Sequence, residues 1–173
     1  VICMQNRIKC AIFDLDGTLV NTITDLGLAC DYLLKSSGIE PVWTEDDYKS
    51  FVGNGAKLLV SRAFDGKLND RELEEQYALF KMKYNEIKMN HAHIYDGMFD
   101  VVSKIKERGI NIAVCTNKPH TAAVGMVKQL FGDSFFDVIV GASDDMPKKP
   151  DPAMAFKILK ETDAKPDECV WIG

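Results

Sequence analysis

The stretch that decides the fold is IKCAIFDLDGTLV, which occupies residues 8–20. Its first six residues are apolar except for Lys9, and a short apolar run of this kind predicts a buried β-strand. The run stops at DLDGT (residues 14–18), where Asp and Gly favour a turn. We therefore expect an interior strand that delivers two carboxylates, Asp14 and Asp16, to its carboxyl end.

Downstream of Tyr95, apolar runs and helical patterns alternate. Strands are expected at residues 110–115, 136–140 and 169–172, and helices at residues 98–108, 120–131 and 153–161. Such alternation is typical of a parallel sheet with helices on its faces. The fold class predicted from the sequence is therefore α/β.

The region between the first strand and Tyr95 has a different pattern. Apolar residues recur at helical spacing, and we expect helices at residues 22–37, from Thr44, at 56–64 and at 70–90, with no convincing strand. The economical interpretation is a helical insertion. Residues 1–19 and 93–173 would form the α/β core, and residues 20–92 a helical domain inserted directly after the first strand.

Composition limits the partners and the compartment. Lys and Arg number 21 and Asp and Glu number 26, so the net charge of −5 offers no basic field for nucleic acid or an anionic membrane. No apolar run approaches the roughly 18 residues of a membrane span. The five cysteines form no CxxC pair and are expected to be buried or idle thiols, which favours a reducing cytoplasm. We expect His91 and His93 to be exposed loop residues and not metal ligands.

The carboxyl ends of parallel strands bring polar residues together at one edge of the sheet. Here those ends carry Asp14 and Asp16, then Thr116 and Asn117, and the third strand leads into Lys149. This set suits phosphoryl transfer, which needs a nucleophile, an acid for the leaving group and neutralisation of anionic oxygens. Two carboxylates facing a phosphate would also favour Mg²⁺ as a cofactor. Thr116, Asn117 and Lys149 are the candidate phosphate-binding residues.

Three motifs carry a resemblance to a known family. FDLDGTLV (13–20), VCTNKP (114–119) and KKPDP (148–152) resemble, in order and separation, the first three motifs of the haloacid dehalogenase superfamily. The resemblance implies that Asp14 is the nucleophile and Asp16 the general acid and base. It also implies that Mg²⁺ is held by the Asp14 carboxylate and the Asp16 backbone carbonyl, and that Lys149 is catalytic. The aspartate at position 16 favours phosphatase or phosphomutase chemistry over dehalogenation.

A finer resemblance points to a subgroup. FVGNGA (51–56) is similar to a segment of phosphoglycolate phosphatases, and residues 116–119 fit the same subgroup. The resemblance implies a Rossmann-like core with a small helical cap domain, in which Gly53, Asn54 and Gly55 form a substrate-specificity loop. The expected partner is a small phosphorylated metabolite, with phosphoglycolate the best single candidate.

Alternatives remain open at this stage. A sugar-phosphate mutase, a nucleotidase or a pyrophosphatase would keep the same fold and change the leaving group. The family's fourth motif, an acidic cluster that completes the metal site, would follow the strand that ends VWIG (170–173). Its absence from this sequence leads us to expect a shortened chain, or else a catalytically inert binding module. The oligomeric state is not predicted.

Overall fold

A computed structural model of the chain describes residues 8–173. These residues form two compact units: one combines the segment up to Leu19 with Ile94–Gly173, and the other comprises Val20–His93. The chain thus leaves the first unit after its first strand and returns to it before the next long strand.

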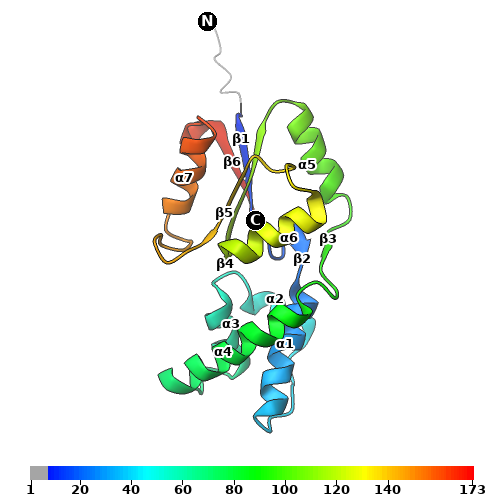
Figure 1. Ribbon diagram of the computed structural model, residues 1–173, viewed down its shortest axis with the longest axis vertical. Coiled ribbons are helices and arrows are strands. Elements are labelled where there is room, and N and C mark those ends of the chain that lie inside the picture. The colour runs from blue at the N-terminus through cyan, green and yellow to red at the C-terminus, as the bar shows by residue number, and fades with distance from the viewer. Residues whose placement is uncertain (1–7) are drawn as a thin grey trace, which may run out of the picture. The chain divides into compact units, whose positions relative to one another are not determined.

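The first unit is built on a four-stranded parallel sheet with strand order β5-β4-β1-β6 (Figure 1). Its strands are β1 (Cys10–Phe13), β4 (Asn111–Pro119), β5 (Val138–Ala142) and β6 (Cys169–Ile172). Each residue of β1 is paired on both sides, for example Cys10 with Asn111 and with Cys169. Because both neighbours shield β1, all four of its residues are buried, as the apolar run predicted.

Helices cover both faces of this sheet, so the α/β prediction is confirmed. They are α5 (Met98–Glu107), α6 (His120–Phe131) and α7 (Ala153–Glu161), and a short 3₁₀ turn, η1 (Pro166–Glu168), precedes β6. Figure 1 shows α7 on one side of the sheet and α5 and α6 on the other. Met154 and Ile158 of α7 pack against Cys10 and Ile12, which point to the same face because side chains alternate along a strand.

Two strand boundaries differ from the prediction. We expected a strand at 110–115, but β4 continues to Pro119, and the strand expected at 136–140 is found at Val138–Ala142. The polar residues that follow Cys115 look like a loop in the sequence. Thr116 and Pro119 still pair with β5, at Gly141 and Ala142, and an irregularity between them accommodates Asn117 and Lys118.

The second unit is helical, with α1 (Ile23–Ser36), α2 (Glu45–Phe51), α3 (Ala56–Ala63) and α4 (Asp70–Ile87). One face of each helix contributes to a common core that includes Leu33, Tyr48, Leu59 and Phe80. Two short strands that we did not predict, β2 (Val20–Asn21) and β3 (His93–Ile94), pair with each other. Strands of two residues are too short to show the alternation on which the prediction depends.

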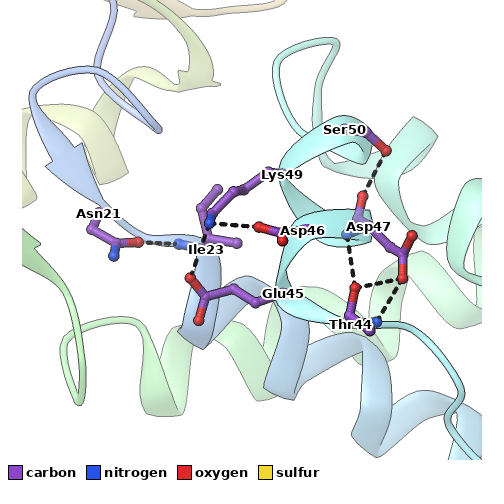
Figure 2. Close-up of polar contacts among 8 residues, drawn as sticks. All are labelled: Asn21, Ile23, Thr44, Glu45, Asp46, Asp47, Lys49 and Ser50. Carbon is purple, nitrogen blue, oxygen red and sulfur yellow. Dashed lines mark hydrogen bonds and ion pairs between the residues drawn. The ribbon is translucent and has the colours of Figure 1, made fainter.

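Thr44 is the N-cap of helix α2, where the sequence predicts the helix start (Figure 2). The Thr44 hydroxyl accepts a hydrogen bond from the Asp47 N–H at 3.2 Å, and the Asp47 carboxylate accepts one from the Thr44 N–H at 2.8 Å. This reciprocal capping box satisfies two backbone donors that a helix start otherwise leaves unpaired. In the same unit, the Asn21 side chain accepts from the Ile23 N–H at the start of α1, at 3.1 Å.

His91 and His93 are exposed as expected, but the His91 side chain makes a specific contact. Its Nδ1 lies 2.7 Å from Oδ1 of Asp25, a carboxylate with no exposed surface on α1. Oδ2 of Asp25 accepts the backbone N–H groups of His91 and Ala92, both at 3.1 Å. Asp25 therefore ties the start of α1 to the segment before β3. Sequence reasoning missed this contact because 66 positions separate the two partners.

The described cysteines are free thiols, as predicted. Cys10, Cys30 and Cys115 are buried and Cys169 is partly exposed, while Cys3 lies outside the described residues. Within residues 8–173, no helix has both the length and the apolar character needed to cross a membrane.

Candidate functional site

The site is built at the carboxyl ends of β1 and β4, within the first unit. Asp14 directly follows β1, and its N–H donates to the Ile172 carbonyl of β6 at 2.9 Å, so its backbone continues the sheet. Its Oδ1 accepts the Leu15 N–H at 2.7 Å, and its Oδ2 lies 2.9 Å from Nζ of Lys149. The carboxylate is thus held in one orientation at the end of the most buried strand.

Lys149 reaches this carboxylate from the loop that follows β5. Its Nζ also donates to the Cys115 carbonyl of β4 at 3.0 Å, and it lies 5.2 Å from the centre of the Trp171 ring. Contacts with β4, with β6 and with the end of β1 hold the ammonium where it faces Asp14. The side chains of Lys149 and Asp14 are 17% and 21% exposed, so the pair is largely withdrawn from water yet open to a small ligand.

Asn117 positions Lys149 through its side-chain amide. Its Oδ1 accepts the Lys149 N–H at 2.8 Å, and its Nδ2 donates to the Lys149 carbonyl at 3.1 Å, next to a cis peptide bond between Lys149 and Pro150. The amide of Asn117 thus anchors the Lys149 backbone through one N–H and its oxygen. The expected role of Asn117 in binding phosphate stays a prediction.

Thr116 lies at the end of the regular part of β4 and is 2% exposed. Its Oγ1 accepts the Lys118 N–H at 3.1 Å, an arrangement that turns the hydroxyl toward the strand end. A hydroxyl that accepts one hydrogen bond keeps its own proton for donation. Thr116 also adjoins Cys115, whose carbonyl contacts Lys149, so the geometry keeps it as a candidate donor to a phosphate oxygen.

Lys118 is a residue of the site that the sequence analysis did not single out. Its Nζ lies 3.0 Å from Oδ1 of Asp16, and the two side chains are only 4% and 14% exposed. The site therefore contains two carboxylate–ammonium pairs, Asp14 with Lys149 and Asp16 with Lys118. Lysines are seldom buried without a charged partner, but nothing in the sequence around Lys118 shows that it is buried.

The neighbouring thiol does not compete with Asp14 as a nucleophile. Burial raises the pKa of Cys115 to about 11, an effect that the nearby Lys149 opposes and Asp14 reinforces. Because only the thiolate attacks, Cys115 is unreactive at neutral pH. The Asp14 carboxylate therefore remains the candidate nucleophile of this edge.

The donor chemistry of the site fits Mg²⁺. Within residues 8–173 no group of three His, Cys, Asp or Glu side chains is arranged to hold a metal by itself. Mg²⁺, however, commonly takes one or two protein carboxylates and completes its shell with water and substrate phosphate oxygens. Asp14 and Asp16, with the backbone carbonyl of Asp16, supply hard oxygen donors of that kind.

The predicted specificity loop belongs to the helical unit. Gly53 and Gly55 lie between α2 and α3 with φ values of 111° and 93°, where a side chain would be strained. Among the described residues, no atom beyond the adjoining residues lies within 4 Å of where a Cβ would sit on either glycine. The two glycines and Asn54 thus form an open turn. Their role toward substrate stays a prediction.

Comparison with known proteins agrees with the motif resemblance. A family model described as haloacid dehalogenase-like hydrolase matches residues 11–173. The chain belongs to this family. The membership accounts for the parallel core and for the order in which the three motifs appear along the chain.

Relatives within the haloacid dehalogenase-like family carry a more specific name. The chain is 32% identical over 172 residues to phosphoglycolate phosphatase 1 of Pseudomonas aeruginosa, covering 95% of this chain and 62% of that protein. It is also 32% identical over 168 residues to phosphoglycolate phosphatase of Colwellia psychrerythraea, covering 94% and 74%. The chain thus spans less than two thirds of the length of the Pseudomonas protein.

Solved structures of the family agree in fold. A crystal structure of a predicted phosphoglycolate phosphatase from Haemophilus somnus superposes with a TM-score of 0.85 at 27% identity, covering 97% of this chain and 77% of that one. CbbY from Rhodobacter sphaeroides in complex with phosphate has a TM-score of 0.73 at 22% identity, covering 95% and 76%. The second likeness shows the fold alone.

Proposed function

We propose that the protein is a phosphatase that hydrolyses a small phosphorylated metabolite, with phosphoglycolate the leading candidate. The observation that carries the proposal is the Asp14 carboxylate, oriented at the end of β1 and paired at 2.9 Å with the ammonium of Lys149. Phosphoryl transfer needs little from a protein beyond a positioned nucleophile and neutralised charge, and this pair supplies both.

The proposed reaction has two steps, each of which balances. In the first, an Asp14 oxygen attacks phosphorus, the bond from phosphorus to the ester oxygen breaks, and Asp16 gives a proton to the departing alkoxide. In the second, Asp16 takes a proton from water, which attacks phosphorus and releases inorganic phosphate and the free Asp14 carboxylate.

The other residues stabilise charge or hold geometry. Lys149 offsets negative charge next to Asp14, and Thr116 can donate its hydroxyl proton to a phosphate oxygen. Losing one donor of this type typically costs about 10²–10³ in rate. When bound, Mg²⁺ would offset the repulsion between the substrate phosphate and the two carboxylates, held by the Asp14 carboxylate and the Asp16 backbone carbonyl.

We further propose that the helical unit is a cap that recognises the leaving group through the turn of Gly53, Asn54 and Gly55. The support is the open turn and its resemblance to the phosphoglycolate phosphatase segment. If so, Gly55→Ala should raise KM for phosphoglycolate several-fold and leave KM for a generic aryl phosphate unchanged. Equal effects on both substrates would contradict a role in specificity.

The main test is phosphate release with Mg²⁺ from a panel of phosphoglycolate, sugar phosphates, nucleotides and pyrophosphate. Asp14→Asn should abolish release, and Asp144→Asn, an exposed acid in the loop after β5, should not. Capture of one phosphoryl group on Asp14 by mass spectrometry of the quenched enzyme would identify the intermediate. Unchanged turnover in Asp14→Asn would refute the mechanism.

The panel also separates the alternatives. Preference for a sugar phosphate, a nucleotide or pyrophosphate would keep the mechanism and change the substrate. Binding of inorganic phosphate without turnover of any ester would favour an inert binding module. The proposed cytoplasmic location fits the free thiols of the described cysteines but needs a separate localisation experiment.

A further inference from the structure

Lys118 is the one buried charge at this edge to which the proposed mechanism assigns no role. The family motif that contains it draws attention to Thr116 and Asn117, yet the Lys118 side chain is the least exposed member of the two ion pairs, at 4%. A buried ammonium is costly unless a partner compensates it. Its presence therefore calls for a function at its contact with Asp16.

The backbone of β4 departs from regular pairing in a way that directs Lys118. Thr116 pairs with Gly141 and Pro119 with Ala142, so Asn117 and Lys118 are extra residues on β4. Bulges of this kind redirect side chains, and they are frequent beside active sites. Here two consecutive residues serve separate targets: Asn117 holds the Lys149 backbone, and Lys118 meets Asp16.

The opposite strand is shaped to permit this path. A Cβ on Gly141 would lie 2.8 Å from the Lys118 carbonyl oxygen and 2.6 Å from the His120 Cα. Such distances to backbone atoms are not tolerated, so the close approach at residues 118–120 depends on glycine at 141. The backbone path at Lys118 is therefore set by the packing of β4 against β5.

We propose that Lys118 is a positioning residue that holds the Asp16 carboxyl group in the orientation needed for proton transfer to the leaving group. This inference rests on the proposed function. Asp16 has to remain an ionisable group for the chemistry, so the pair cannot be exchanged for two apolar side chains, as a purely structural ion pair often can. Lys149 performs the equivalent task for Asp14, which gives each carboxylate its own ammonium.

A test by leaving group isolates this role. Lys118→Met removes the ammonium but keeps an unbranched side chain of similar length, and Lys148→Met, at an exposed neighbouring position, is the matched control. Alkyl phosphates such as phosphoglycolate need a proton on the departing oxygen, whereas 2,4-dinitrophenyl phosphate does not. Their kcat/KM values report only the steps up to formation of the aspartyl phosphate.

In Lys118→Met we expect kcat/KM for phosphoglycolate to fall by about 10²-fold, within the usual contribution of general acid–base catalysis. The value for 2,4-dinitrophenyl phosphate should fall less than about tenfold, with a burst of dinitrophenolate because the second step still depends on Asp16. Lys148→Met should match the wild type for both esters. Equal losses for the two esters, or no loss for either, would overturn the inference.

A second measurement needs no turnover and covers the case in which Lys118→Met fails to fold. The ¹⁵Nζ signal of Lys118 should shift in Asp16→Asn and stay unchanged in Asp96→Asn. An Asp16→Asn variant that leaves the signal in place would show that the contact does not exist in solution. Failure of the proposed function is distinguishable, because turnover of either ester by Asp14→Asn refutes the nucleophile whatever Lys118 does.

Discussion

Replacing Gly141 by alanine tests how tightly the strand path at the site is determined. The added Cβ would lie 2.6 Å from the His120 Cα, 2.8 Å from the Lys118 carbonyl oxygen and 2.9 Å from the His120 nitrogen. All three are backbone atoms, so no rotamer change relieves the clash and the start of α6 has to move. Overpacking of this kind typically costs about 1–3 kcal/mol.

Part of this cost is offset, because alanine in a strand is favoured over glycine by about 0.5–1 kcal/mol. The net loss expected for Gly141→Ala is therefore about 1.5 kcal/mol. Gly125→Ala is the matched control: Gly125 is exposed in α6, and no atom lies within 4 Å of its added Cβ. There the same substitution should stabilise the protein by about 0.8–1 kcal/mol, the helix-propensity difference between the two residues.

Urea unfolding measures both effects. Trp171 lies in β6 of the α/β unit, and a Trp43→Phe background leaves it the only tryptophan, so its fluorescence reports on this unit. With an m-value of about 2 kcal/mol/M, the midpoint should fall by roughly 0.7 M in Gly141→Ala and rise by roughly 0.4 M in Gly125→Ala. A Gly141→Ala protein as stable as its parent would refute the close approach of β5 to residues 118–120.

Three further predictions concern other parts of the chain. Asp25→Ala should lower the free energy of unfolding by about 3 kcal/mol, because two backbone N–H groups and an imidazole lose their acceptor. The control Asp46→Ala breaks an exposed ion pair and should lower it by under 1 kcal/mol in the same urea titration. Hydrogen bonds from Thr44 lower the pKa of Asp47 below its ordinary value of 3.8. The Asp47 carboxylate therefore stabilises α2 above that pH, and this stabilisation is lost as the pH falls below it. Asp47→Asn should remove this pH dependence of stability in acid titrations followed by circular dichroism. Because Cys115 is buried, it should resist a disulfide reagent in native protein at pH 8 and react only after unfolding, as mapped by mass spectrometry. Rapid labelling of Cys115 in the native protein would contradict its burial.

The candidate site shows which residues could be located from the sequence. Parallel strands bring their carboxyl ends to one edge of the sheet. The spacing of the motifs was therefore enough to nominate the residues near those ends, which are Asp14, Asp16, Thr116 and Lys149. What each residue contacts could not be predicted in the same way. The two ends of the Asn117 amide are taken up by Lys149, 32 positions away, and no local pattern encodes that distance.

The sequence by itself determined the sheet, the helical insertion and the edge that carries the candidate site, because apolar periodicity and turn residues act over a few neighbouring positions. The tertiary structure alone decided the partners of each charge: Lys118 with Asp16, Lys149 with Asp14, and His91 with Asp25. Each pair joins residues from distant parts of the chain, and its strength depends on burial. Burial becomes defined only when the strands and helices pack and exclude water.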